Sequence, residues 1–133
     1  IIYETYAKSI NIEALTMIDM AGKQIIPAVI RYTKVLADTV NAVKMAGADA
    51  ATQDELLTIV GEKLTAMQTA LEKLKKAEKE ASVMEDAKAQ AFFYKDTVRA
   101  AMDELRAPAD ELEMIVDKEY WPIPTYGELM FEI

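Results

Sequence analysis

Turn-forming residues are scarce in this chain, and their scarcity constrains the fold more than any other feature of the sequence. Only four glycines and four prolines occur among 133 residues, and three of the prolines lie after position 107. A β-rich domain of this length needs many more turns, so the sequence predicts an all-α fold. The length suits about one domain with a buried core.

Apolar residues recur three and four positions apart in three segments, which is the spacing of amphipathic helices. The first stripe, on a helix reaching Met45, consists of Leu15, Ile18, Gly22, Ile25, Val29, Tyr32, Leu36 and Val43. The second consists of Leu56, Val60, Leu64, Met67, Leu71 and Leu74. The third consists of Ala87, Ala91, Tyr94, Val98, Ala101 and Leu105. Three such stripes joined by short links predict an antiparallel bundle of three long helices.

Two prolines fall within these helical patterns. Pro27 lacks an amide donor, and it favours a kink in the first helix over a full break because the stripe keeps its register beyond it. Pro108 predicts the end or a kink of the third helix, since the residue before a proline avoids helical torsions. An acidic start at Asp110 then predicts a short fourth helix that ends near Asp117.

Capping motifs suggest where the second and third helices begin. Thr52 and Glu55 form a capping box, in which each side chain pairs with a free backbone amide at the helix start. The second stripe lapses after Lys75, and Ser82 with Glu85 offers another capping box. A tight turn near Glu80 to Ser82 is therefore predicted. One unbroken helix that projects into solvent is the alternative.

The composition excludes several classes of active site. Histidine and cysteine are absent, which rules out Ser-His-Asp triads, cysteine nucleophiles, thiolate metal sites and the Glu-x-x-His pairs of di-iron bundles. The glycines are isolated and form no phosphate-binding loop. Gly61 lies inside the second stripe and predicts close helix packing there. We therefore assign no catalytic, cofactor-binding or metal-ligating residue to this chain.

The charge of the chain limits its partners. A formal net charge of −8 disfavours nucleic acid, because binding to phosphates needs a basic surface. The same charge disfavours an anionic membrane surface. We expect neither nucleic acid nor membrane as a partner.

The last thirteen residues change character. Two prolines and a glycine in residues 121–127 exclude regular helix, and a strand-like alternation follows them up to Ile133. The sequence thus divides into a helical bundle, 1–120, and an extended tail, 121–133. Six large apolar side chains in this tail are candidate docking residues: Trp121, Ile123, Tyr126, Leu129, Phe131 and Ile133. They would pack either on the bundle itself or on a surface beyond it.

Three segments carry a family resemblance. Trp121–Ile133 resembles the extreme C-terminus of type III glutamine synthetases, Met20–Ala28 resembles the first helix after their catalytic domain, and Arg106–Glu113 also matches. The resemblance implies a parent enzyme that joins ammonia to glutamate with ATP and magnesium or manganese. It also implies ring-shaped homo-oligomers in the cytoplasm. The family's metal, nucleotide and glutamate residues lie in the catalytic region before these segments, so none transfers to a residue here.

Two function hypotheses from different classes follow. In the first, the chain is the C-terminal structural or assembly domain of a glutamine synthetase, with no cofactor of its own, and its partners are the catalytic domain of the same chain and neighbouring subunits. In the second, it is a free-standing helical module that binds a partner protein. The opening residues Ile1 and Ile2 favour the first hypothesis, since they suggest a piece of a longer chain.

Overall fold

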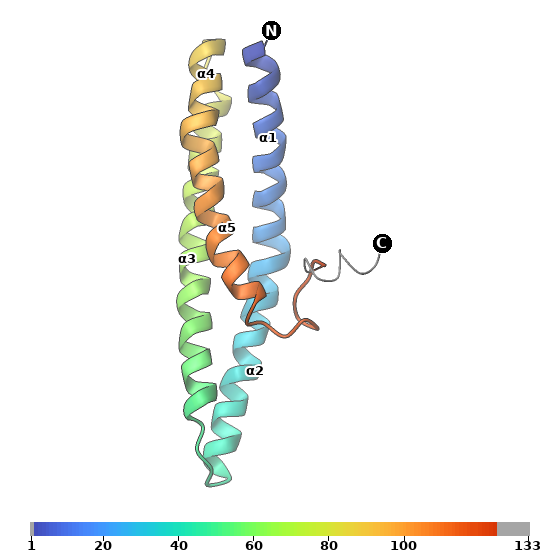
Figure 1. The fold of residues 1–133 in the computed structure, drawn as a ribbon, viewed down its shortest axis with the longest axis vertical. Coiled ribbons are helices and arrows are strands. Elements are labelled where there is room, and N and C mark those ends of the chain that lie inside the picture. Colours follow the sequence, from blue (N-terminus) through green and yellow to red (C-terminus); the bar gives the residue numbers. More distant parts are fainter. Residues whose placement is uncertain (1, 125–133) are drawn as a thin grey trace.

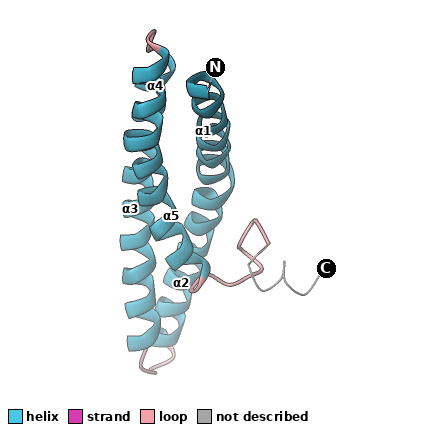
Figure 2. Cartoon of the chain, turned by 45° about the horizontal axis from the view of Figure 1, so that its top comes forward, coloured by secondary structure: helices cyan, strands magenta, loops and turns pink. Residues whose placement is uncertain are grey.

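Helices make up most of the computed structural model, which describes residues 2–124 (Figure 1). The first rod consists of α1 (Ile2–Met20), the π-helical turn η1 (Ala21–Ile25) and α2 (Ile26–Met45). The second is α3 (Ala51–Ser82). The third consists of α4 (Ala87–Phe93), the π-helical turn η2 (Tyr94–Val98) and α5 (Arg99–Glu113). No strand occurs in residues 2–124 (Figure 2), so the predicted all-α bundle is confirmed.

The three rods extend over different lengths of the bundle. In one part of the molecule α1 packs on α3 and on the rod formed by α4, η2 and α5, and we call this part the three-helix region. At the other end α2 and α3 form a helical hairpin without a third helix (Figure 1), because α5 ends at Glu113 and the chain turns away. We call this hairpin, residues 33–59, the two-helix end. The bundle core therefore belongs mainly to the three-helix region.

The predicted buried faces of the second and third helices are largely correct. The largest side chains that are almost fully buried are Met67, Leu71, Leu74, Leu105, Leu112, Val29, Val60 and Val98. The first stripe is wrong at its start, since Leu15 is 49% exposed while Ala14 is fully buried. A small alanine side chain allows neighbouring helices to approach closely, and it carries little signal in a hydrophobic pattern.

The buried face of α3 also continues beyond the point where the stripe was expected to lapse. Ala77, Glu78 and Ala81 are all buried. Gly61, in contrast, does not mark close packing, because a Cβ built there would meet no other atom within 4 Å. That prediction was wrong.

Pro27 does not end the first rod. The turn η1 lies directly before it, and the amide of Ile26 donates to the carbonyl of Ala21, five residues back. The helix then continues to Met45, as predicted. A π turn adds one residue to a single turn, so the backbone bonding changes just before the residue that has no amide to donate.

Pro108 does not end the third rod either. It is buried inside α5, which runs on to Glu113. The separate short helix predicted from Asp110 to Asp117 is therefore wrong. Leu105 and Leu112 are both almost fully buried on either side of the proline. Their packing offsets the cost of proline in a helix interior, about 3 kcal/mol.

The turn between the first and second rods differs in detail from its prediction. Gly47 has a φ of 84°, in the left-handed region that glycine adopts at helix ends. Helix α3 begins at Ala51, whose amide donates to the Asp49 carboxylate at 3.0 Å. The N-cap residue is Ala50, which makes no side-chain hydrogen bond to the helix. The predicted capping box of Thr52 with Glu55 was therefore wrong.

The turn between α3 and α4 is confirmed, and it lies slightly later than predicted, because α3 continues to Ser82 and α4 begins at Ala87. The Asp86 carboxylate accepts a hydrogen bond from the amide of Ala89 at 2.8 Å and caps α4. Ser82 donates to the carbonyl of Lys79 within its own helix. The alternative of one unbroken helix is thereby excluded, and the cap belongs to Asp86 and not to Ser82.

Candidate functional site

A polar cluster in the three-helix region joins all three rods. Asn11 of α1, Glu78 of α3 and Tyr94 of η2 meet there. The Tyr94 hydroxyl donates to Glu78 Oε1 at 3.1 Å, and Asn11 Nδ2 contacts both the same carboxylate oxygen and, at 3.1 Å, the Tyr94 hydroxyl. Glu78 is 8% exposed and Tyr94 is 2% exposed. A carboxylate taken this far out of water needs such donors, and each of them comes from a different rod.

The cluster also sets the ionisation of the phenol. Burial, and then the hydrogen bond to and the charge of Glu78, raise the pKa of Tyr94 above its ordinary value of 10.0. The hydrogen bond from Asn11 acts in the opposite direction. A phenol held protonated in this way is a donor to the Glu78 carboxylate, so the hydrogen bond ties η2 to α3.

A small cleft opens beside this cluster. It holds about 230 Å³ and is lined by Glu4, Ala7, Lys8, Asn11, Ser82, Gln90 and Tyr94. The Gln90 amide donates to the carbonyl of Ala81 at 2.9 Å across the α3–α4 turn. Asn11, Ser82, Gln90 and Tyr94 are each engaged in a hydrogen bond within the bundle, and we assign the cleft no ligand.

The start of the tail packs on the bundle. Trp121 is 7% exposed and belongs to the core, and Ile123 packs against it while partly exposed. Tyr120 stacks at a tilt on Tyr32, with ring centroids 5.6 Å apart. The other candidate docking residues, Tyr126, Leu129, Phe131 and Ile133, and the expected strand-like alternation lie outside the described residues.

Trp121 has one unusual feature. Its indole Nε1 is buried, and no acceptor for it is present among residues 2–124. Next to the indole lies a mainly apolar cavity of about 260 Å³, whose walls include Met17, Ala21, Leu105 and Ile123. A buried donor without a partner costs about 1–3 kcal/mol, so an acceptor from elsewhere would stabilise this site.

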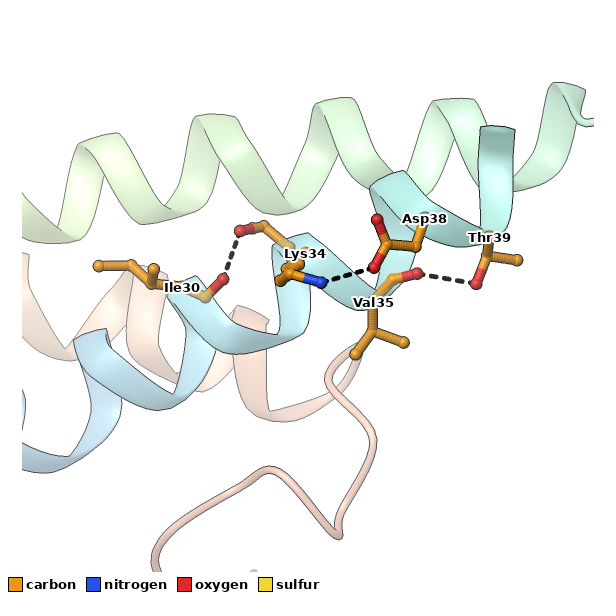
Figure 3. Close-up of polar contacts among 6 residues, drawn as sticks. Ile30, Lys34, Val35, Asp38 and Thr39 are labelled. Atoms are coloured by element: carbon orange, nitrogen blue, oxygen red, sulfur yellow. Dashed lines mark hydrogen bonds and ion pairs between the residues drawn. The ribbon is translucent and has the colours of Figure 1, made fainter. Parts of the chain in front are cut away.

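The charged groups on the outer faces form ordinary surface pairs. Figure 3 shows the exposed side of α2, where Lys34 Nζ lies 2.9 Å from Asp38 Oδ2 and the Thr39 hydroxyl donates to the Val35 carbonyl at 2.7 Å. The hydrogen bond to Asp38 and then its charge raise the pKa of Lys34 above 10.5. Both side chains are mostly exposed, and exposed pairs of this kind contribute little to stability.

Sequence reasoning missed the polar cluster. Glu78 falls four residues after Leu74 and three before Ala81, on the buried face of α3. That spacing was the available signal, and it was overlooked because glutamate is rarely buried. In residues 2–124 no three acidic side chains gather into a group suited to a metal ion. None of the helices in the same range combines the length and apolar character that a membrane span requires.

Comparison with known proteins places this arrangement in a family. The family described as the glutamine synthetase C-terminal domain matches residues 1–44. A glutamine synthetase of Butyrivibrio fibrisolvens is 37% identical over 100% of this chain and 19% of its own length. The glutamine synthetase of Bacteroides fragilis (strain YCH46) is 30% identical over 96% of this chain and 18% of its own length.

A third relative makes the match more specific. The type-3 glutamine synthetase of Dictyostelium discoideum is 30% identical over 98% of this chain and 19% of its own length. The chain thus spans about a fifth of the length of these relatives, and it matches their C-terminal part. On these matches the chain belongs to the glutamine synthetase family and corresponds to the C-terminal region of its members, the type-3 enzyme among them.

Proposed function

We propose that this chain is the C-terminal structural domain of a glutamine synthetase and that it helps the parent enzyme assemble. The parent would join ammonia to glutamate in the cytoplasm with ATP and magnesium or manganese, as a homo-oligomer. The observation that carries the proposal is the similarity to glutamine synthetases over nearly the whole chain, which covers only their C-terminal fifth.

The interior of the bundle supports a structural role for the domain. The buried Glu78 and Tyr94 and the half-buried Asn11 are engaged with one another. Its buried apolar groups fill one continuous core. A domain built in this way offers its partners a rigid surface. Its partners would be the preceding catalytic region of the same chain and neighbouring subunits, and Tyr126, Leu129, Phe131 and Ile133 are the proposed docking residues.

Deletion in the full-length enzyme tests this function. One variant lacks the whole region that corresponds to residues 1–133, and a second lacks only residues 125–133, which leaves Trp121 and Ile123 in place. We expect the first variant to lose its oligomeric mass by light scattering and to lose glutamine formation with it. A smaller loss of both is expected in the second. An enzyme that assembles and turns over normally without the region would refute the proposal.

A further inference from the structure

The end of the bundle at which α1 begins carries an exposed apolar patch. Helices α1 and α4 lie side by side there (Figure 1). Between them is a mainly apolar hollow of about 270 Å³, which is lined by Ile2, Tyr3, Tyr6, Ala91, Phe92 and Lys95. We call these six residues the N-terminal patch.

Two aromatic rings form the centre of the N-terminal patch. The ring centroids of Tyr3 and Phe92 lie 6.3 Å apart at a tilt, and Lys95 Nζ lies 5.8 Å from the centroid of the Phe92 ring. Tyr3 is nevertheless 42% exposed and Phe92 is 44% exposed. The rings thus hold one another in place while much of their surface stays accessible, so a partner that covers them would order few side chains.

The position of Tyr3 on α1 shows that the patch continues the core. Tyr3 lies four residues before Ala7 and seven before Ile10, both of which are buried. This spacing places it on the core-facing side of the helix. An aromatic side chain can bury about 150–250 Å², so covering Tyr3 and Phe92 removes a large apolar area from water. Apolar surface gathered in this way is typical of an interaction site.

We propose that the preceding region of the parent chain docks on the N-terminal patch. This inference rests on the proposed function, in which the chain is the C-terminal domain of a longer enzyme. The chain spans about a fifth of its relatives and matches their C-terminal part. In such a parent, about four fifths of the length joins the domain at residue 1, directly before Ile2. Since Ile2 itself lines the hollow, this occupant is tethered at the rim of the patch.

The tether favours this occupant over a separate molecule. A short linker gives the joined region an effective concentration in the millimolar range, whereas a separate molecule loses translational and rotational freedom when it binds. The patch also defines the chemistry of the contact. Five of its six residues are apolar or aromatic, and Lys95 is the charged one. We expect an apolar side chain against Tyr3 and Phe92, with a carbonyl or carboxylate oxygen near Lys95.

The accessibility of a cysteine in the patch tests the proposal, because the 133-residue chain contains no cysteine. The probe is Phe92→Cys, and the control is Val35→Cys, at a position that is 37% exposed on α2 (Figure 3). The rate of alkylation by iodoacetamide is measured by mass spectrometry of the peptide that contains the new cysteine. Each variant is measured in the 133-residue chain and in the full-length enzyme.

We expect Phe92→Cys to react at least about tenfold more slowly in the full-length enzyme, as a site covered about 90% of the time does. Val35→Cys should change less than about twofold. Tyr3→Cys, on the other helix of the patch, is a second probe that should repeat the result. Equal rates for Phe92→Cys in the two proteins would overturn the proposal. Equal protection of Val35→Cys would also overturn it, because the shielding would then be general.

Photo-cross-linking identifies what covers the patch. A benzophenone amino acid replaces Phe92 in the full-length enzyme, and the cross-linked peptides are mapped after irradiation. We expect a product with the mass of one subunit, joined to a peptide of the preceding region. A product with the mass of two subunits would assign the patch to a neighbouring subunit and refute the proposal.

These readouts separate the inference from the proposed function, since they measure neither oligomeric mass nor glutamine formation. An enzyme that needs the domain for assembly but leaves the N-terminal patch reactive would refute this inference alone. An enzyme that assembles without the domain, but in which the patch is protected, would refute the assembly role alone.

Discussion

The three-helix region and the two-helix end are built from the same kind of sequence, yet they bury very different amounts of it. In residues 33–59, the two-helix end, only Leu36, Val40 and Ala50 are buried. In the three-helix region every turn of α3 from Val60 onward brings apolar groups against α1 or α5. A helix pair can cover one side of each helix only. The difference indicates that packing against a third rod stabilises this bundle, and we expect the two-helix end to open first.

The largest effect should follow from a charge placed in the three-helix region. Leu74 is fully buried, so Leu74→Asp should cost several kcal/mol and unfold the chain, because the new carboxylate has no partner. Circular dichroism during a thermal melt measures this directly. Lys76→Asp, on the exposed side of the same helix, is the matched control and should leave the melt nearly unchanged. The reverse ranking would mean that the buried face of α3 is misassigned.

A smaller effect is expected at the two-helix end. Leu36→Ala should cost about 2 kcal/mol, near the lower limit for such changes, because water can reach the vacated site. Its loss should also be local. Hydrogen exchange should speed up in residues 33–59 and stay unchanged around Leu71 and Leu105. Exchange that rises equally throughout the chain would show that the two regions unfold as one unit.

The smallest effect should come from the polar cluster. Tyr94→Phe removes one donor to Glu78 but leaves Asn11 in place, so we expect a loss of about 1 kcal/mol near neutral pH. Urea titration measures it. Tyr3→Phe, at an exposed position on α1, is the matched control for loss of a hydroxyl.

Tyr94→Phe should also change how the stability of the chain depends on pH in alkali. The folded chain raises the pKa of Tyr94 above the ordinary value of 10.0, so it favours the protonated phenol. The resulting stability is fully present below pH 10.0 and is lost as pH rises through the higher folded value. The wild-type chain should therefore lose stability in strong alkali by a component that Tyr94→Phe lacks. Parallel alkaline curves for the two proteins would contradict the assignment.

Large side chains made the fold predictable from sequence, and small ones hid its details. Leu71, Leu74 and Leu105 occupy the buried faces that their spacing indicates. Ala14 is buried in place of Leu15, because contact between close-packed helices selects for small size as well as apolar character. A proline inside a helical pattern usually ends the helix. Pro108 does not, because the packing of its neighbours on α3 overrides that tendency.

The polar cluster could not be predicted in the same way. Asn11 and Glu78 are 67 residues apart in sequence, and Tyr94 is 16 residues from Glu78. Periodicity within one helix places a residue on a face, but it does not say which residue of another helix lies opposite. The role of a buried glutamate depends on that partner, and the partner is fixed only when the rods are docked.

The meeting of Asn11, Glu78 and Tyr94 also has a consequence for the lengthwise alignment of the rods. Interfaces lined by alanine, such as those at Ala7, Ala77 and Ala81, are smooth and would tolerate sliding by a turn. A shift of one rod by a turn, about 5.4 Å, would strip the Glu78 carboxylate of its donors. The cluster thus fixes the axial register of the three rods. Any redesign that lengthens or shortens a rod must keep these three residues at the same height along the bundle.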